Sequence, residues 1–212
     1  MPARSLITTL SFLLWFSLSL ASASEHAVID NDGEPLVPGQ EYYITSAIRG
    51  AGGGGVFPVK TGDLSSCEYS ITQASSDLDR GTLVKFHVSG VSTDKIYLGW
   101  TFLEIDFVEK PTCAESSKWA AAPNYAGSSL YRLVIGDTKS VSGYFQIQGL
   151  NSFSYKLVFC PGSVKVVPPT CYDIGLGANR NLVVKHYDNT GNSAKTWVFV
   201  KAQSVKGKFS II

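Results

Sequence analysis

Short segments of strand-forming residues recur along most of the chain, and this recurrence narrows the possible folds more than any other feature. Eight such segments, rich in β-branched and aromatic residues, lie at 41–45, 82–88, 102–107, 131–135, 144–147, 155–159, 182–186 and 196–201. In one of them Leu103, Ile105 and Phe107 alternate with Glu104 and Asp106, the period typical of a strand with one buried face. Helical signals are nearly absent. The pattern therefore predicts an all-β protein, either a closed barrel or a sandwich.

Clusters of Gly, Asn and Asp separate these segments, and the longest is Gly50-Ala51-Gly52-Gly53-Gly54-Gly55. A phosphate-binding loop would be followed by Lys-Ser or Lys-Thr at the start of a helix. Instead, Val56-Phe57-Pro58-Val59 follows, and Pro58 opposes a helix. We therefore expect a flexible surface loop at 50–55. No linker-like stretch divides the rest of the chain, so residues 24–212 are expected to form one domain.

The first 23 residues have the pattern of a secretory signal peptide. Arg4 precedes an apolar run from Leu6 to Leu20, and Ala21-Ser22-Ala23 is a small-residue cleavage pattern. The run of about 15 residues is interrupted by Ser and Thr, and it falls short of the roughly 20 that a membrane-spanning helix needs. We expect cleavage before Ser24, no membrane anchor, and secretion to the cell exterior or the vacuole.

The charge balance excludes one class of partner. The chain has 18 Lys and Arg against 17 Asp and Glu, a net charge of +1, and loss of Arg4 with the signal peptide leaves zero. Nucleic-acid binding needs clustered, uncompensated Lys and Arg. A hydrophobic content of 44% with 17% charged residues also excludes wholesale disorder. We expect a soluble monomer that binds neither nucleic acid nor membranes.

The cysteines predict disulfides rather than a metal site. The four are Cys67, Cys113, Cys160 and Cys171, and the three histidines are His26, His87 and His186. No C-x-x-C spacing occurs and the histidines stand far away in sequence, so neither zinc nor another cofactor is expected. Two disulfides fit an oxidising compartment better. Of the three possible pairings we favour Cys67–Cys113 with Cys160–Cys171, because the second bond closes only a short loop.

Motifs that signal catalysis are missing from the sequence. Neither H-E-x-x-H nor G-x-S-x-G occurs. Asp32 and Glu34 are close in sequence, but a paired-carboxylate site requires convergence in space, and we expect solvated turn acids there. The sequence therefore predicts a protein with no catalytic residues.

Several longer motifs occur in a fixed order along the chain. They are VIDNDGEPL at 28–36, GQEYYI at 39–44, SDLDRG at 76–81, Trp119, YKLVFCP at 155–161, DIG at 173–175 and LVV at 182–184. In this order they resemble the soybean trypsin inhibitor (Kunitz-type) family of plants, and the resemblance covers residues 26–202. It implies a β-trefoil, in which three pseudo-repeats form a six-stranded barrel capped by three hairpins, and it implies the sequential disulfide pairing.

The resemblance also implies a function. Members of this family commonly inhibit serine proteases: an exposed loop enters the protease cleft like a substrate, and its P1 side chain, which precedes the scissile bond, fills the specificity pocket. Alignment places this loop at about 88–96, and its candidate residues are Gly90, Val91, Ser92, Thr93, Asp94 and Lys95. The loop is most similar to the branch that includes cereal subtilisin/amylase inhibitors. Counting from either side puts P1 between Val91 and Thr93; we expect Ser92, with Lys95 as the alternative if the loop is shifted.

Two departures from the family pattern weaken the expectation of trypsin inhibition. The expected P1 is not Arg or Lys, whereas the acidic trypsin pocket favours a cation. Pro38 stands where the family often has a loop-supporting Asn, and proline has neither a side-chain amide nor a backbone N–H. We therefore expect subtilisin-, elastase- or chymotrypsin-like targets ahead of trypsin. The alternatives are a non-inhibitory storage, defence or binding protein, as in miraculin-like relatives, and α-amylase binding through a face that the sequence does not locate.

Overall fold

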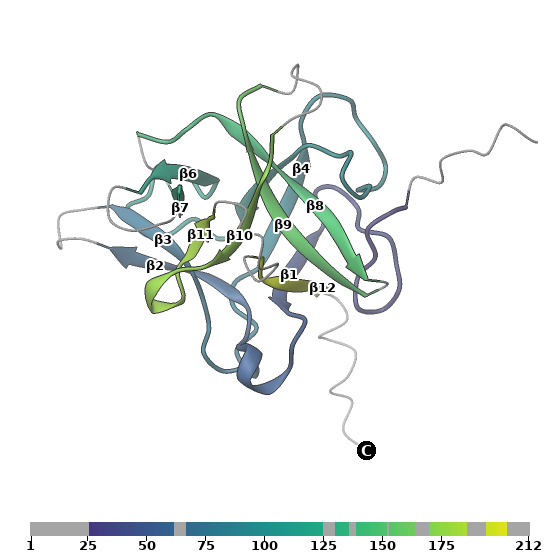
Figure 1. The fold of residues 1–212 in the computed structure, drawn as a ribbon, viewed down its shortest axis with the longest axis horizontal. Helices are drawn as coiled ribbons and strands as arrows, with labels where there is room; N and C mark the ends of the chain where they lie inside the picture. Colours follow the sequence, from purple (N-terminus) through teal and green to yellow (C-terminus); the bar gives the residue numbers. More distant parts are fainter. Residues whose placement is uncertain are drawn as a thin grey trace, which may run out of the picture.

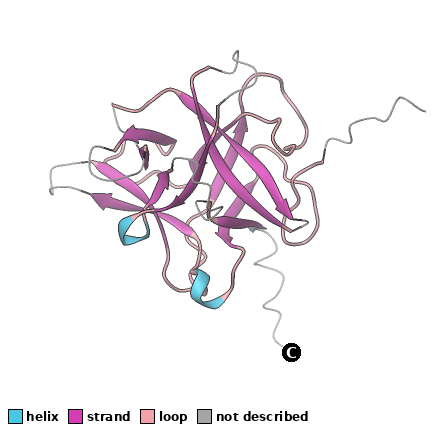
Figure 2. Ribbon diagram, viewed as in Figure 1, coloured by secondary structure: helices cyan, strands magenta, loops and turns pink. Residues whose placement is uncertain are grey.

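The computed structural model describes residues 26–61, 67–124, 130–135, 139–151, 153–163, 170–185 and 194–202. Strands dominate these residues, and the helical elements among them are two short 3-10 turns, η1 (Gly50–Gly52) and η2 (Ala178–Arg180) (Figure 2). The predicted signal peptide and His186 lie outside the described residues. The prediction of an all-β chain is confirmed.

Six antiparallel strands form a closed barrel. They are β1 (Glu41–Ser46), β4 (Val84–Val88), β5 (Leu103–Phe107), β8 (Gly143–Asn151), β9 (Ser154–Pro161) and β12 (Thr196–Lys201). Neighbouring strands follow the order β12-β1-β4-β5-β8-β9. Pairing of Trp197 in β12 with Tyr155 in β9 then closes the ring (Figure 1). Closure leaves the barrel without an open edge.

The other six strands in the described chain form three hairpins over one end of the barrel. They are β2 (Val56–Thr61) with β3 (Glu68–Gln73), β6 (Trp119–Pro123) with β7 (Tyr131–Ile135), and β10 (Tyr172–Leu176) with β11 (Leu182–Val184). Strand β7 pairs with both β3 and β11, so the hairpins lie side by side (Figure 1). The order of barrel strand, hairpin and barrel strand occurs three times along the chain. This is the β-trefoil that the family resemblance implies.

The core fills the barrel and the space beneath the hairpins. Its largest buried side chains are Trp119, Trp197, Phe86, Phe107, Phe159 and Phe199. The rings of Phe86 and Phe199 meet edge to face with centroids 5.5 Å apart, an arrangement that aromatic pairs favour. Strand β5 buries every second residue as its sequence pattern predicts, and β1 does the same.

Two disulfides join the cysteines in the favoured pairing. Cys67, just before β3, bonds to Cys113 in the segment after β5, and Cys160 in β9 bonds to Cys171 before β10. Cys160 also packs with Tyr144 and Val158 in a small cluster on the outside of the barrel. The second disulfide therefore stabilises the β8–β9 side of the barrel as well as its own short loop.

The glycine run at 50–55 differs from its prediction. Gly53, Gly54 and Gly55 are buried, and the backbone N–H of Gly54 donates to the Ala74 carbonyl (2.9 Å). A Cβ added to Gly55 would overlap the carbonyl oxygen of Arg80. The prediction of a flexible surface loop is therefore wrong for this half of the run, because two chain segments approach more closely here than a side chain allows.

Candidate functional site

The six predicted loop residues lie together in the connection between β4 and β5. The loop begins where Val88 pairs with Leu103 and where the Ser89 N–H donates to the Phe102 carbonyl (2.8 Å). The rings of Phe102 and Tyr144 meet edge to face with centroids 4.3 Å apart. The base of the loop therefore continues the barrel and also rests on the outer cluster that contains the Cys160–Cys171 disulfide.

The far side of the loop is held by Ile96, which is fully buried. Its N–H donates to the Leu36 carbonyl (3.0 Å), and its own carbonyl accepts from the Val28 N–H (2.8 Å). Two residues later Leu98 donates to the His26 carbonyl (3.0 Å). The N-terminal segment thus forms a short bridge to the loop, and the chain is fixed immediately after Lys95.

Between these two anchors residues 90–95 extend into solvent. Gly90, Val91, Ser92 and Asp94 are exposed, and the side chain of Val91 has an exposed fraction of 82%. Within the stretch the Thr93 hydroxyl donates to the Lys95 carbonyl (2.6 Å), and both residues are half-buried. The arrangement is an exposed hexapeptide held at both ends.

Pro38 lies in the turn that supports this region, and its neighbours make the contacts that proline cannot. Gly39 donates to the Phe86 carbonyl in β4 (2.8 Å), and Val37 donates to the Tyr42 hydroxyl (2.9 Å). Leu36 accepts from Ile96 as described above. Backbone bonds on both sides of Pro38 therefore hold the base of the loop, whereas the exposed hexapeptide receives no side-chain amide from position 38.

Two ion pairs involve side chains of β4 and β5, the strands that carry the loop. His87 Nε2 and Asp106 Oδ2 are 3.2 Å apart, and Lys118 Nζ lies 2.7 Å from Glu104 Oε1. Burial raises the pKa of Asp106, although His87 and Lys118 act in the opposite direction. The His87–Asp106 pair therefore joins β4 to β5, whereas the Lys118–Glu104 pair joins β5 to the segment just before β6 (Trp119–Pro123).

Sequence reasoning missed the aromatic residues that adjoin the loop. Trp100 has an exposed fraction of 74%, and with Val91, Tyr97 and Phe102 it lines a largely apolar hollow of about 460 Å³. The residue type alone does not separate this exposed tryptophan from the buried Trp119 and Trp197. Its place in a turn between Gly99 and Thr101 is the one available hint.

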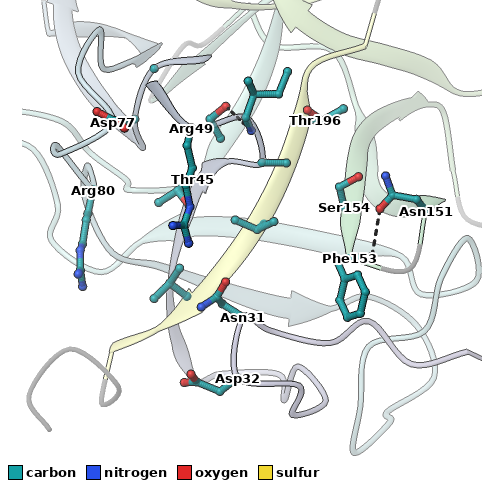
Figure 3. Close-up of a pocket in the computed structure, with 17 residues that line it drawn as sticks. Asn31, Asp32, Thr45, Arg49, Asp77, Arg80, Asn151, Phe153, Ser154 and Thr196 are labelled. Atoms are coloured by element: carbon teal, nitrogen blue, oxygen red, sulfur yellow. Dashed lines mark hydrogen bonds between the residues drawn. The ribbon is translucent and has the colours of Figure 1, made fainter. Parts of the chain in front are cut away.

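A larger hollow, about 900 Å³, lies elsewhere, around the ends of β1 and β12 (Figure 3). Its labelled side chains come from several elements, and two of them accept hydrogen bonds from the backbone. Asp77 accepts from the Gly50 N–H (2.9 Å) and Asn151 accepts from the Phe153 N–H (3.0 Å). Asp32 on its rim is exposed, and so is Glu34, as predicted for solvated turn acids. The hollow brings together no Ser–His pair among its described lining residues.

No group of three or more His, Cys, Asp or Glu side chains within the described ranges could hold a metal ion. Likewise, none of the described helical segments has the length and apolar character to cross a membrane.

Comparisons with known proteins agree on the kind of protein. The family model described as "Trypsin and protease inhibitor" (Kunitz, legume) matches residues 28–192. A Kunitz-type trypsin inhibitor-like protein of Pisum sativum is 37% identical over 95% of this chain and 94% of its own length. A subtilisin inhibitor of Canavalia lineata is 34% identical over 76% of this chain and 87% of its own. The crystal structure of a Kunitz-type trypsin inhibitor from Cicer arietinum superposes with a TM-score of 0.72 at 36% identity, covering 84% of this chain and 99% of that one.

Proposed function

This chain belongs to the Kunitz-type trypsin and protease inhibitor family of plants, and from that premise we propose that it inhibits serine endopeptidases through the β4–β5 loop. The observation that supports this most directly is the exposed hexapeptide 90–95 between two fixed ends. Inhibitors named for trypsin and for subtilisin are among its relatives. Because those names describe the relatives, we infer the target of this chain from the residues of its own loop.

The proposed mechanism is that of a substrate that is not released. The hexapeptide enters the protease cleft, and the loop loses little entropy because Ser89 and Ile96 are already held. If the protease cuts the loop, the same anchors keep the two new ends close together. Rejoining the ends then competes with release, since both reacting groups stay near each other. Turnover stalls and the protease remains occupied.

We propose Ser92 as P1, with the scissile bond between Ser92 and Thr93. Both Ser92 and its neighbour Val91 are exposed, and a small side chain suits the restricted pockets of elastase-like enzymes. Lys95, the alternative, is less suited because its P1′ partner would be Ile96. Ile96 is fully buried and hydrogen-bonded through both its N–H and its carbonyl, so a protease could reach that bond only after the anchor came apart.

The test is titration of the secreted protein against subtilisin, elastase, chymotrypsin and trypsin, with the nicked form identified by mass spectrometry. We expect stoichiometric inhibition of a small-P1 protease and a nick between Ser92 and Thr93. A nick after Lys95 together with trypsin inhibition would overturn the choice of P1. Absence of inhibition in all four titrations would reject the proposed function.

Arginine substitutions locate P1 independently of the natural target. Ser92→Arg should improve trypsin inhibition by about a hundredfold, because the new cation fills the acidic pocket. Val91→Arg, one residue earlier, serves as the matched comparison and should gain much less. If Val91→Arg gains more, P1 is Val91. Lys95→Ala should leave inhibition of the natural target unchanged.

A non-inhibitory storage or defence role is the second candidate, and Pro38 is the observation that favours it. The hexapeptide lacks the side-chain amide that other family members supply from this position, and a less constrained loop is more readily cut as a substrate. In the titration this candidate predicts either rapid and complete cleavage of the loop or no interaction with any of the four enzymes.

Secretion also remains a proposal, because residues 1–23 lie outside the described residues. The proposed signal peptide would leave a mature chain beginning at Ser24. N-terminal sequencing of the protein isolated from plant cells or their medium tests the cleavage site, and the fraction in which it is found separates vacuole from cell exterior.

A further inference from the structure

Trp100 is the one described tryptophan that is exposed to solvent. Its exposed fraction of 74% contrasts with the buried Trp119 and Trp197. A tryptophan side chain has a large apolar area, so leaving it in water forgoes a substantial stabilisation. Large exposed aromatic groups beside a hollow are typical of interaction sites.

The turn that carries Trp100 is held in place by several hydrogen bonds. The Tyr97 N–H donates to the Thr101 hydroxyl (2.8 Å), and the Thr101 N–H donates to the Tyr97 carbonyl (3.3 Å). Gly99 adopts a φ of +69° and donates to the Ile147 carbonyl in β8 (2.8 Å). Trp100 is therefore presented at a defined position, so little conformational entropy remains to be lost on binding.

The surface around Trp100 is continuous with the proposed inhibitory loop. Val91 and Trp100 line the same hollow, together with Tyr97 and Phe102. Val91 is adjacent to the proposed P1 residue, and its side chain is also largely exposed. A protease that takes up residues 90–95 would thus approach Trp100 at the same time.

We propose that Trp100 is a second anchor for the protease, packing on an apolar rim of its cleft while Ser92 or its neighbour occupies the specificity pocket. This inference rests on the proposed function and deepens it, since it assigns binding energy to a residue outside the substrate-like hexapeptide. Aromatic anchors beside a central contact commonly supply much of the affinity of an interface. A target with an apolar rim is therefore favoured over one with a charged rim.

Phe153 provides a matched control. It is aromatic and has an exposed fraction of 75%, but it follows β8 and lines the hollow around β1 and β12, away from the loop (Figure 3). Both Trp100→Ala and Phe153→Ala remove an exposed ring, so neither should greatly change the denaturation midpoint. Only the first removes a group beside the loop.

The experiment measures the inhibition constant of each variant against the protease that the wild-type protein inhibits best. We expect Trp100→Ala to raise this constant by about ten- to thirtyfold, mainly through faster dissociation, while Phe153→Ala leaves it unchanged. Trp100→Phe should retain most of the affinity. The nick should stay at the same bond in every variant, because the anchor does not define P1.

Labelling the inhibitor with fluorotryptophan gives a second readout that does not depend on inhibition kinetics. The ¹⁹F resonance that disappears in Trp100→Phe belongs to Trp100, and it should shift and lose its sensitivity to a soluble quencher when the protease is added. The resonances of Trp119 and Trp197 should change little, because both rings are already buried.

Three outcomes would overturn the inference. If the wild-type protein inhibits and Trp100→Ala inhibits equally well, Trp100 is no anchor and the proposed function stands. If sedimentation shows that Trp100→Ala abolishes a dimer without changing the inhibition constant, the surface binds a second copy instead. If the wild-type protein inhibits none of the proteases, both the proposed function and the anchor fail.

Discussion

Two loops of this chain begin with glycine, one between barrel strand β1 and cap strand β2 and one between barrel strands β4 and β5, yet they differ in nearly every contact. In the loop at 50–55, Gly53, Gly54 and Gly55 are buried against the segment around Arg80. In the loop at 90–95, Gly90 has no atom within 4 Å of where a Cβ would stand, and the following residues extend into solvent.

Side chains account for much of the difference. The Arg180 guanidinium donates to the Gln73 side chain (2.7 Å) and the Gln73 carbonyl (3.2 Å), and it reaches the Gly52 carbonyl (3.3 Å). Lys195 donates to the same Gly52 oxygen (2.7 Å). The loop at 90–95 is held at its ends instead. The contacts at 50–55 hold that backbone inside the fold. The backbone at 90–95 is held only at its two ends and is exposed between them.

The comparison is tested most strongly by adding one methyl group to each loop. Gly55→Ala should lower the free energy of unfolding by about 4 kcal/mol or more, because the new Cβ overlaps the Arg80 carbonyl and the backbone must move. Gly90→Ala should cost only about 1–2 kcal/mol, since space is open and the strain comes from a φ of +94° alone. Guanidinium denaturation of both variants measures the difference. Equal losses would show that the two glycines serve the same purpose.

The anchor at Ile96 can be weakened against a matched core position. Ile96→Ala and Ile174→Ala each truncate a fully buried isoleucine, and each should cost about 2–4 kcal/mol of stability. Only Ile96→Ala should also speed proteolysis within residues 90–95, by roughly tenfold, because one end of the loop is then less constrained. Denaturation and mass-spectrometric time courses provide the two measurements. Similar cleavage rates in both variants would remove Ile96 from its proposed role.

Removal of the Arg180 side chain should affect stability without affecting inhibition. Arg180→Ala deletes the hydrogen bonds to Gln73 and Gly52, for a loss of about 1.5–3 kcal/mol. Arg180→Lys is the control: it keeps the charge but not the planar fork, so it should recover only part of the loss. The inhibition constant should stay the same in both. A large change in that constant would show that the two loops are coupled.

The smallest expected effect is a pH dependence at Lys195. Burial lowers the pKa of Lys195, and the nearby Arg180 charge lowers it further, below the ordinary value of 10.5. Between the lowered folded pKa and 10.5 the unfolded chain binds more protons, so the wild-type protein should gain stability as pH rises through that window. The gain is absent well below the lowered folded pKa, where Lys195 is charged in both states.

Lys195→Met removes this titration and gives the reference. The difference in unfolding free energy between the two proteins should shift in favour of the wild type as pH rises from neutral to 10.5. Tyr42 and Tyr155, whose pKa values burial raises, are common to both proteins, and their contributions cancel in the difference. A difference that is constant with pH would contradict the lowered pKa.

Eight strands were evident in the sequence because their residues combine high β-propensity with alternation. Four were not. Strand β2 contains Pro58, which an edge strand tolerates because the missing N–H leaves no bond unmade. The alanines of β6 have low β-propensity, and their pairing with β7 holds them in the sheet. Local preference could not predict either strand, since both are held by pairing with the next strand of their hairpin.

By itself, the sequence determined the all-β class, the favoured disulfide pairing and the place of the hexapeptide 90–95, since these follow from alternation, cysteine spacing and motifs in order. Tertiary structure decided which glycine run is buried, which tryptophan is exposed, and that Ile96 closes the loop. Those properties depend on what lies opposite each residue in space. A glycine or a tryptophan looks the same in the sequence whether it is buried or exposed, and only the neighbouring chain segments decide which it is.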